Sequence, residues 1–308
     1  MKNLLFCALL GMALAACGGS APKPTLAPTA PAKESAFVGA ARGISIADAP
    51  VVPAISQKAR QLYKDGVAAG NNPRVFSKVG DCMTENAHFM APFAEGQYAL
   101  GEYTALEPTI KNYFGVPARV AQNAGQSWAQ DSFATKGIAS FGGFNVAGPL
   151  DATWADPKWC NAGETPLTCE YRVTKPSVAL IMFGTNDAAA TDPETFVAFY
   201  RQMIEQTTAQ KILPVLSTFP TRPENVGKSV LLNQLVLALG REYDLPVINL
   251  NRALEPLPNR GVDAQDTTHL TVPANGRADD LTPAGLQAGF NMRNLVTLQT
   301  LHAILAGK

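Results

Sequence analysis

The sequence predicts an α/β protein, and three observations lead to this prediction. A continuous apolar run at 178–183 has the composition of a strand buried on both faces of a parallel sheet. Shorter runs at 75–79, 211–218 and 245–250 also have strand character. Helical stretches of ten or more residues separate several of these runs, which is typical of a sheet covered by helices. We therefore expect a three-layer α/β/α sandwich with a mostly parallel, five-stranded sheet.

The elements can be assigned in chain order. The expected helices are 55–69, 192–209, 225–242 and 282–306, and the expected strands are 75–79, 118–121, 178–183, 211–218 and 245–250. Asp192 before Pro193 is a strong helix start, because the carboxylate can cap the helix and proline suits its first position. Pro214 cannot donate a ladder hydrogen bond, so its strand is expected near an edge. Residues 137–172 have little periodicity and are interpreted as an insertion that covers one edge of the sheet.

The amino-terminal segment predicts export. Lys2 precedes an uncharged apolar run at 4–16 that is too short to span a bilayer, as in a signal peptide. The run ends in Leu-Ala-Ala-Cys17, which resembles a bacterial lipobox and implies cleavage before Cys17 and lipid attachment to it. An ordinary signal peptide that happens to precede a cysteine is the alternative. We expect a signal peptide at 1–16, a lipidated Pro/Ala-rich tether at 17–36, and an anchored lipoprotein of the cell envelope, in the outer membrane, the periplasm or at the cell surface.

Composition argues against a nucleic-acid partner. Lys plus Arg and Asp plus Glu number 25 each, and charged residues make up only 16% of the 308 residues. A neutral chain without basic blocks lacks the electrostatic footprint of nucleic-acid binding. Residues 37–308 are sufficient for one large domain, which we expect to be a monomer.

The cysteines fall into three groups. Cys7 leaves with the predicted signal peptide and Cys17 takes the predicted lipid. Cys160 and Cys169 enclose only eight residues in a loop-like segment, so we expect them to pair in an oxidising compartment. Cys82 then remains as a free thiol, and retention of such a thiol requires either burial or a function.

Three polar motifs stand out: two follow predicted strands, and one lies in the loop before the last predicted helix. Gly80-Asp81-Cys82 ends the strand 75–79 with a potential nucleophile. Asn186, in Gly-Thr-Asn-Asp after the strand 178–183, can donate to a developing oxyanion. Asp266 stands three residues before His269 and can bond one ring nitrogen while the other faces a nucleophile. Taken alone, each of the last two motifs is also typical of an ordinary polar or capped turn.

Together and in this order, the motifs resemble the SGNH (GDSL-type) hydrolase superfamily. Its blocks are Gly-Asp-Ser, a glycine after the second strand, Gly-x-Asn-Asp and Asp-x-x-His. Gly125 is the candidate for the second block, and the resemblance covers about residues 70–308. It implies a flavodoxin-like sandwich that hydrolyses esters of carbohydrate, lipid or other small acyl compounds. It implies no metal and no organic cofactor.

The resemblance also implies residue roles. His269 would act as general base and then acid, and Asp266 would orient it. The oxyanion hole would combine Asn186 with the backbone N–H groups of Gly125 and Cys82. Many members carry the second block as Asn-x-x-x-x-Gly, whose last place here is Trp128, so Gly125 requires a shifted register.

The larger departure is Cys82 at the position of the family's serine. One hypothesis is a cysteine-dependent acyl hydrolase, because a thiol beside a histidine is a strong nucleophile. The alternative is an inactive module that binds a glycan or lipid at the cell surface, since a site shaped for serine can fail with the larger sulfur atom. A third hypothesis makes Cys82 a buried apolar residue of an unrelated domain. Trp154 and Trp159 can stack on sugar rings or pack within their loop.

Overall fold

A computed structural model describes residues 34–120 and 129–307. Its centre is a four-stranded parallel sheet with the order β1-β4-β5-β6. The strands are β1 (Asn72–Gly80), β4 (Pro176–Met182), β5 (Leu213–Ser217) and β6 (Val247–Ile248). All seven residues of β4 are buried, as the continuous apolar run predicted. The α/β prediction with a mostly parallel sheet is confirmed.

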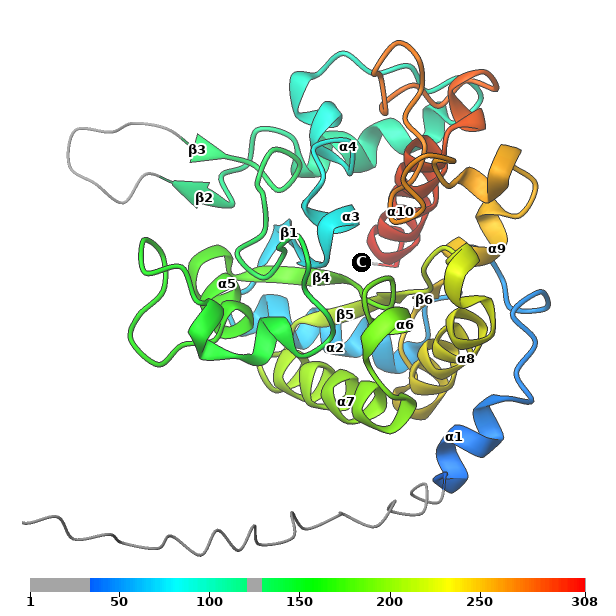
Figure 1. Cartoon of the computed structure of the whole chain (residues 1–308). Coiled ribbons are helices and arrows are strands. Elements are labelled where there is room, and N and C mark those ends of the chain that lie inside the picture. Colours follow the sequence, from blue (N-terminus) through cyan, green and yellow to red (C-terminus); the bar gives the residue numbers. More distant parts are fainter. Residues whose placement is uncertain (1–33, 121–128, 308) are drawn as a thin grey trace, which may run out of the picture. The chain divides into compact units, whose positions relative to one another are not determined.

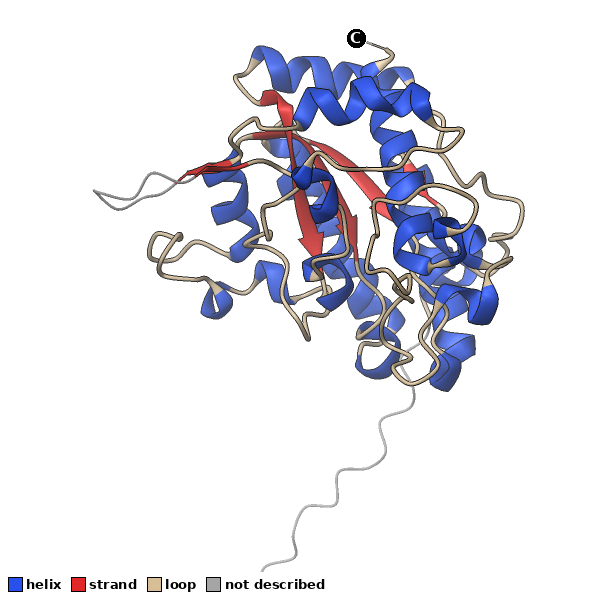
Figure 2. Cartoon of the chain, turned by 90° about the horizontal axis from the view of Figure 1, so that it is seen from above, coloured by secondary structure: helices blue, strands red, loops and turns tan. Residues whose placement is uncertain are grey.

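Helices cover both faces of this sheet and complete the three layers (Figures 1 and 2). In Figure 1, α7 (Pro193–Ala209) and α8 (Val226–Tyr243) pack together below the sheet. Above it, α10 (Gly289–Leu305) packs against α4 (Glu107–Tyr113). The remaining α-helices are α1 (Ala36–Ala41), α2 (Gln57–Ala68), α3 (Cys82–Glu85), α5 (Pro166–Thr174), α6 (Asp187–Ala190) and α9 (Leu250–Leu254).

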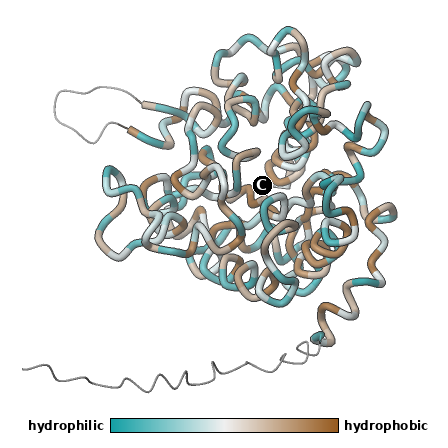
Figure 3. The backbone as a smooth tube through the Cα atoms, viewed as in Figure 1, coloured by the Kyte–Doolittle hydropathy of each residue, from teal (hydrophilic) through white to brown (hydrophobic). Residues whose placement is uncertain are grey.

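α2 and α7 are amphipathic, whereas α8 and α10 are more apolar and bury most of their residues. Hydrophobic and hydrophilic residues alternate along the tube in Figure 3. The predicted cap of α7 is present, since the Asp192 side chain accepts a hydrogen bond from the Thr195 N–H. Among residues 34–120 and 129–307, no helix combines the length and apolar character needed to cross a bilayer.

Within the described residues the sheet has four strands, where five are predicted. The segment expected as a second strand forms β2 (Arg119–Val120), which pairs antiparallel with β3 (Ala129–Gln130) in a separate small sheet. The free edge of β1 is instead met by Ser140, which makes an isolated parallel bridge with Gly80. The chain comes so close there that a Cβ on Gly137 would lie 2.1 Å from the Lys78 carbonyl oxygen. A short glycine-bounded segment therefore occupies the fifth-strand position without forming a ladder.

Two further elements differ from the sequence prediction. The last helix begins at Gly289 instead of 282, because Gly285–Gln287 form a 3₁₀ turn and Ala288 is extended. β5 lies inside the sheet, although Pro214 predicted an edge. The pairing with β6 starts only at Leu216, so at Pro214 the strand has a neighbour on the β4 side alone.

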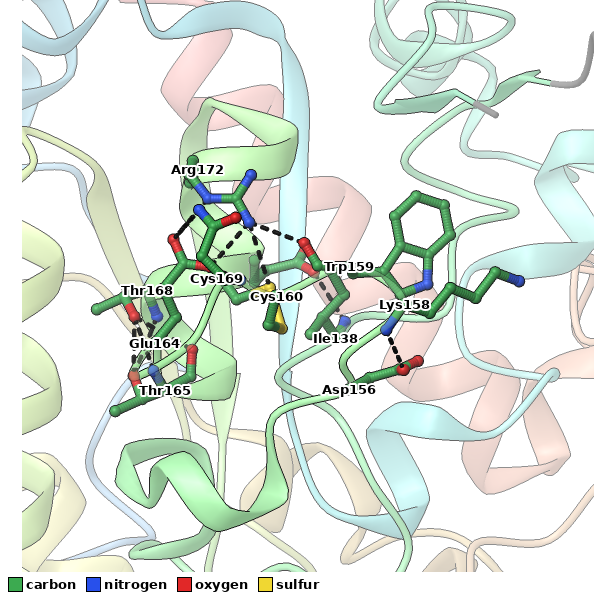
Figure 4. Close-up of a disulfide and its surroundings, with 12 residues drawn as sticks. Ile138, Asp156, Lys158, Trp159, Cys160, Glu164, Thr165, Thr168, Cys169 and Arg172 are labelled. Carbon is green, nitrogen blue, oxygen red and sulfur yellow. Dashed lines mark hydrogen bonds and ion pairs between the residues drawn. A yellow bond between two sulfur atoms is a disulfide. The ribbon is translucent and has the colours of Figure 1, made fainter. Parts of the chain in front are cut away.

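The predicted disulfide is confirmed, and Cys82 is a free thiol. Cys160 and Cys169 are joined with a Cα–Cα distance of 5.2 Å. Figure 4 shows Arg172 beside this bond, where it donates to Glu164 and to the carbonyl oxygen of Trp159. The disulfide thus ties the loop before α5 to the helix itself.

Candidate active site

The turn after β1 places Cys82 at the carboxyl end of the sheet. Asp81 caps α3, and Cys82 is the first residue of that one-turn helix. Gly80 stands in register with Met182, the last residue of β4. A Cβ on Gly80 would lie 2.3 Å from the Thr84 hydroxyl and 2.7 Å from the Met182 carbonyl oxygen. Only glycine permits this close approach, so the turn is fixed against β4.

Two buried charges lie beneath the turn. The Asp81 carboxylate accepts from the Met83 N–H at 3.0 Å, and burial raises its pKa to about 6. Arg293, from α10, donates to the Met83 carbonyl at 2.7 Å and to the Thr84 hydroxyl at 2.9 Å. The Arg293 guanidinium also stacks 3.6 Å from the ring centre of Phe89. Burial lowers the pKa of Arg293 to about 9, and its charge opposes the upward shift of the Asp81 pKa.

The Cys82 thiol is half-buried and hard to ionise. Burial raises its pKa to about 12, and the negative charges of Asp81 and Asp266 add to the shift. The thiol is therefore protonated at neutral pH. Removal of its proton requires a base that acts during the attack.

The Asp266–His269 loop contains a histidine whose ring can accept a proton. The Asp266 Oδ2 and His269 Nδ1 atoms lie 2.5 Å apart, which leaves Nε2 as the ring atom that can accept a proton. The backbone closes the loop, since the His269 N–H donates to the Asp266 carbonyl at 2.9 Å and the Asp263 N–H donates to the His269 carbonyl at 3.0 Å. Hydrogen bonds from Thr268, and then from His269, hold the pKa of Asp266 below its usual value.

A chain of contacts connects this loop to the turn after β4. The Thr267 hydroxyl donates to Glu224, which also pairs with Arg222 at 3.4 Å. Arg222 in turn donates to the Thr185 carbonyl oxygen at 3.3 Å. The Asp266 charge acts on the Cys82 thiol as well. The three motifs thus meet at one edge of the sheet.

Asn186 follows β4, as predicted, and one of its amide hydrogens is already engaged. Its Nδ2 atom donates to the Phe144 carbonyl oxygen at 2.8 Å. The neighbouring Asp187 is buried and accepts from the Val146 N–H at 3.1 Å and the Thr191 hydroxyl at 2.8 Å. The turn after β4 therefore holds the segment 144–146 beside it.

The sequence prediction missed the turn 141–144, which lies against Cys82. The Phe141 N–H donates to the Gly80 carbonyl at 3.3 Å. A Cβ on Gly142 would lie 4.0 Å from the Cys82 Cβ atom. The signal was a pair of adjacent glycines after the short apolar stretch at 138–139, but the interpretation of 137–172 as an insertion concealed it. The predicted donor Gly125, together with Trp128 and the predicted lipid site Cys17, lies outside the described residues.

One group of side chains among the described residues has the proximity of a metal site. It consists of Cys160, Glu164 and Cys169. The two sulfur atoms are bonded to each other, so they are not the thiolates that a metal ion requires. The group is explained by the disulfide.

Comparison with known proteins supplies the family. A sequence model of the GDSL-like Lipase/Acylhydrolase family matches residues 108–276, more than half of the chain. The matched range contains Asn186, Asp266 and His269 and begins after Cys82. No curated protein matches the chain.

Two solved structures are similar to it. A lipase/acylhydrolase from Enterococcus faecalis is 20% identical, with 53% of this chain and 73% of that chain covered and a TM-score of 0.38. A GDSL-like lipase from Bacteroides thetaiotaomicron VPI-5482 is 16% identical, with coverages of 79% and 96% and a TM-score of 0.39. At these values the two structures carry no argument about the site. On the family match, the chain belongs to the GDSL-like lipase/acylhydrolase family, a family of esterase-type hydrolases.

Proposed function

We propose that the protein is an acyl hydrolase in which Cys82 attacks the ester carbonyl, His269 moves the proton and Asp266 orients His269. The observation that carries this proposal is the 2.5 Å contact between Asp266 and His269 in a loop whose charge acts on Cys82. A base and its orienting carboxylate beside a nucleophile are the elements of a catalytic triad.

The high pKa of Cys82 favours general-base catalysis over a preformed thiolate. His269 Nε2 takes the thiol proton as the sulfur bonds to the carbonyl carbon, and the same proton passes to the leaving alcohol oxygen as the C–O bond breaks. A thioester remains on Cys82. His269 then takes a proton from water, the water oxygen bonds to the carbonyl carbon, and the sulfur leaves with that proton. The products are one carboxylic acid and one alcohol.

Three donors are available for the oxyanion. Asn186 has a second amide hydrogen besides the one bonded to Phe144. The Cys82 backbone N–H lies at the start of α3, and Gly142 lies beside the Cys82 side chain. We propose Gly142 in addition to the predicted Gly125. Loss of one such donor typically costs about a hundredfold to a thousandfold in rate.

The test compares wild type, Cys82→Ala, Cys82→Ser and His269→Ala on p-nitrophenyl esters. His88→Gln is the matched histidine control, because His88 packs 5.8 Å from the Phe290 ring centre and has no role in the proposal. We expect wild-type hydrolysis, its loss in Cys82→Ala and His269→Ala, and its retention in His88→Gln. Trapping of an acyl group on Cys82, detected by mass spectrometry after acid quench, should also require His269.

Two results would overturn the proposal. Full activity in Cys82→Ala would remove Cys82 from the chemistry. Activity that appears only in Cys82→Ser would show a site in which cysteine has abolished catalysis, and it would favour the inactive glycan- or lipid-binding module.

We also propose that the enzyme is anchored to a membrane through lipid on Cys17, as supported by Leu-Ala-Ala-Cys17 and by the Pro/Ala-rich stretch at 17–36. Cys17→Ser should move the protein from the detergent phase to the aqueous phase in a phase-partition assay. Equal partition of the variant and wild type would contradict the anchor.

A further inference from the structure

A cavity of about 370 Å³ adjoins the candidate active site, and nothing in the proposed mechanism uses it. Aromatic and charged side chains line it together. Six of them carry the argument: Arg119, Lys136, Phe141, Phe144, Trp154 and Asp156. We call this cavity the aromatic pocket. Its volume is in the range of pockets that hold small organic ligands.

The aromatic pocket shares a wall with the catalytic residues. Phe141 and Phe144 begin and end the turn whose Gly142 lies beside Cys82. The carbonyl of Phe144 accepts the amide hydrogen of Asn186 at 2.8 Å, and the Phe141 N–H donates to Gly80. A group bound in the pocket would therefore be held next to the thiol and the oxyanion donors.

Two aromatic rings of the pocket are unusually exposed for their size, and the buried Phe144 packs beneath them. Trp154 is 55% exposed and Phe141 is 47% exposed. Their ring centres lie 5.9 Å apart, and Phe144 lies 5.5 Å from Phe141 and 5.7 Å from Trp154. Exposed apolar side chains that cluster beside a catalytic centre are typical of a binding surface. They offer flat apolar faces to a ligand.

Charged groups surround these rings. Lys136 pairs with Glu85 of α3 at the active-site side. Arg119 is buried, donates to the Lys136 carbonyl at 2.5 Å and lies 3.5 Å from Glu170. Its Nε atom is buried and has no hydrogen-bond partner within the described residues. Asp156 adds a carboxylate to the lining.

We propose that the aromatic pocket binds a sugar ring of the ester substrate, a refinement that rests on the proposed ester hydrolysis. The apolar face of a sugar ring can stack on Trp154 and Phe141, while its hydroxyl groups accept from Lys136 and Arg119 and donate to Asp156. A fatty acyl chain would cover the same rings but would desolvate these charged groups without giving them hydrogen bonds, which is unfavourable. The mixed lining thus selects a polyhydroxylated ring over an alkyl chain.

The kinetic test uses Trp154→Ala and Trp154→Phe on acetylated xylo-, manno- and chito-oligosaccharides, p-nitrophenyl acetate and p-nitrophenyl octanoate. We expect Trp154→Ala to lower kcat/KM on the cleaved sugar ester about tenfold more than on p-nitrophenyl acetate, chiefly through KM, and Trp154→Phe to restore most of it. Phe114→Ala is the matched control, because Phe114 is 42% exposed but lies outside the aromatic pocket. A loss that is largest on the octanoate would overturn the sugar proposal.

The binding test separates this proposal from catalysis. In the Cys82→Ala background, titration with the same oligosaccharides should change the tryptophan fluorescence, and Trp154→Ala should weaken binding about tenfold. Sugar binding without esterase activity in wild type would contradict the proposed hydrolysis alone. Esterase activity on p-nitrophenyl acetate with neither binding nor cleavage of any oligosaccharide would overturn the sugar site alone.

Discussion

The two sides of the candidate active site are held in different ways. The Cys82 turn is fixed by long-range packing: Gly80 lies against β4, and Arg293 reaches the turn from α10, 210 residues after Met83. The Asp266–His269 loop is fixed mainly by its own short-range hydrogen bonds, with the exposed Thr267–Glu224 hydrogen bond as its link to the turn after β4, and the Asp266 side chain is 54% exposed. The turn that carries the proposed nucleophile is therefore anchored in the core, whereas the proposed base belongs to an exposed loop.

Because of this difference, substitutions on the two sides of the site should affect stability and activity differently. A change beneath Cys82 should disturb both the fold and the chemistry, because the same contacts serve both. A change within the Asp266–His269 loop should disturb the chemistry alone, because exposed hydrogen bonds contribute little to the free energy of unfolding. Four predictions examine this distinction.

The largest effect is expected from Asp266→Asn. The amide can hold His269 in the wrong tautomer, so kcat should fall by about a hundredfold to ten thousandfold. The free energy of unfolding should change by less than about 1 kcal/mol. Ester hydrolysis and urea denaturation measure the two quantities, and a large loss of stability would show that the loop is not an independent surface element.

Arg293→Met should reduce both kcat and the free energy of unfolding. It removes the donors to Met83 and Thr84 and leaves Asp81 buried without its nearby positive charge, which costs about 3–5 kcal/mol. Arg201→Met, at an exposed pair with Glu242, is the matched control and should cost less. Urea denaturation checks both variants, and equal losses would contradict a special role for the buried guanidinium.

The pH dependence of stability should report Asp81. The pKa of Asp81 is about 6 in the folded protein and has its ordinary value of 3.8 in the unfolded chain, so the folded state binds more protons than the unfolded state between these values. The stabilising contribution of Asp81 to the free energy of unfolding is thus fully present below pH 3.8. It is lost as the pH rises through 6, by about 3 kcal/mol in total. The free energy of unfolding of Asp81→Asn should therefore rise by that amount relative to wild type between pH 3 and pH 7. Parallel stability curves for the two proteins would refute the assignment.

The smallest effect is expected from the double variant Cys160→Ser/Cys169→Ser. Loss of a cross-link across nine positions should cost about 2–3 kcal/mol through the entropy of the unfolded chain. Hydrolysis of p-nitrophenyl acetate below the unfolding transition should be retained, because the disulfide lies outside the catalytic residues. The double variant shows whether a moderate loss of stability alone lowers activity. If it is inactive, the loss of activity in Arg293→Met cannot be assigned to the contacts beneath Cys82.

Structural features that are set by residues adjacent in the sequence could be predicted. The buried strand β4, the Asp192 cap and the Cys160–Cys169 pair each follow from a few adjacent positions. The Asp266–His269 contact also belongs to this class, since a spacing of three residues suits one turn. These features need no knowledge of the rest of the fold.

Features that depend on distant contacts could not be predicted. The segment around Ser140 has an apolar stretch of only two residues, 138–139, and only its approach to Gly80 places it at the sheet edge. Residues 118–121 have strand character and are expected as a strand of the sheet, yet Arg119 and Val120 pair with Ala129–Gln130 in a separate sheet. Nothing in the sequence of an apolar terminal helix shows that Arg293 is directed at a turn far earlier in the chain.

The raised pKa of Cys82 also bears on how long the protein lasts. Hydrogen peroxide and disulfides react with thiolates, and at pH 7 a thiol with a pKa of about 12 is almost entirely protonated. The burial and neighbouring carboxylates that prevent a standing thiolate thus protect the sulfur from sulfenic acid formation. The burial that raises the pKa of Cys82 thus slows oxidation of its sulfur and also makes its proposed reactivity depend on a base such as His269.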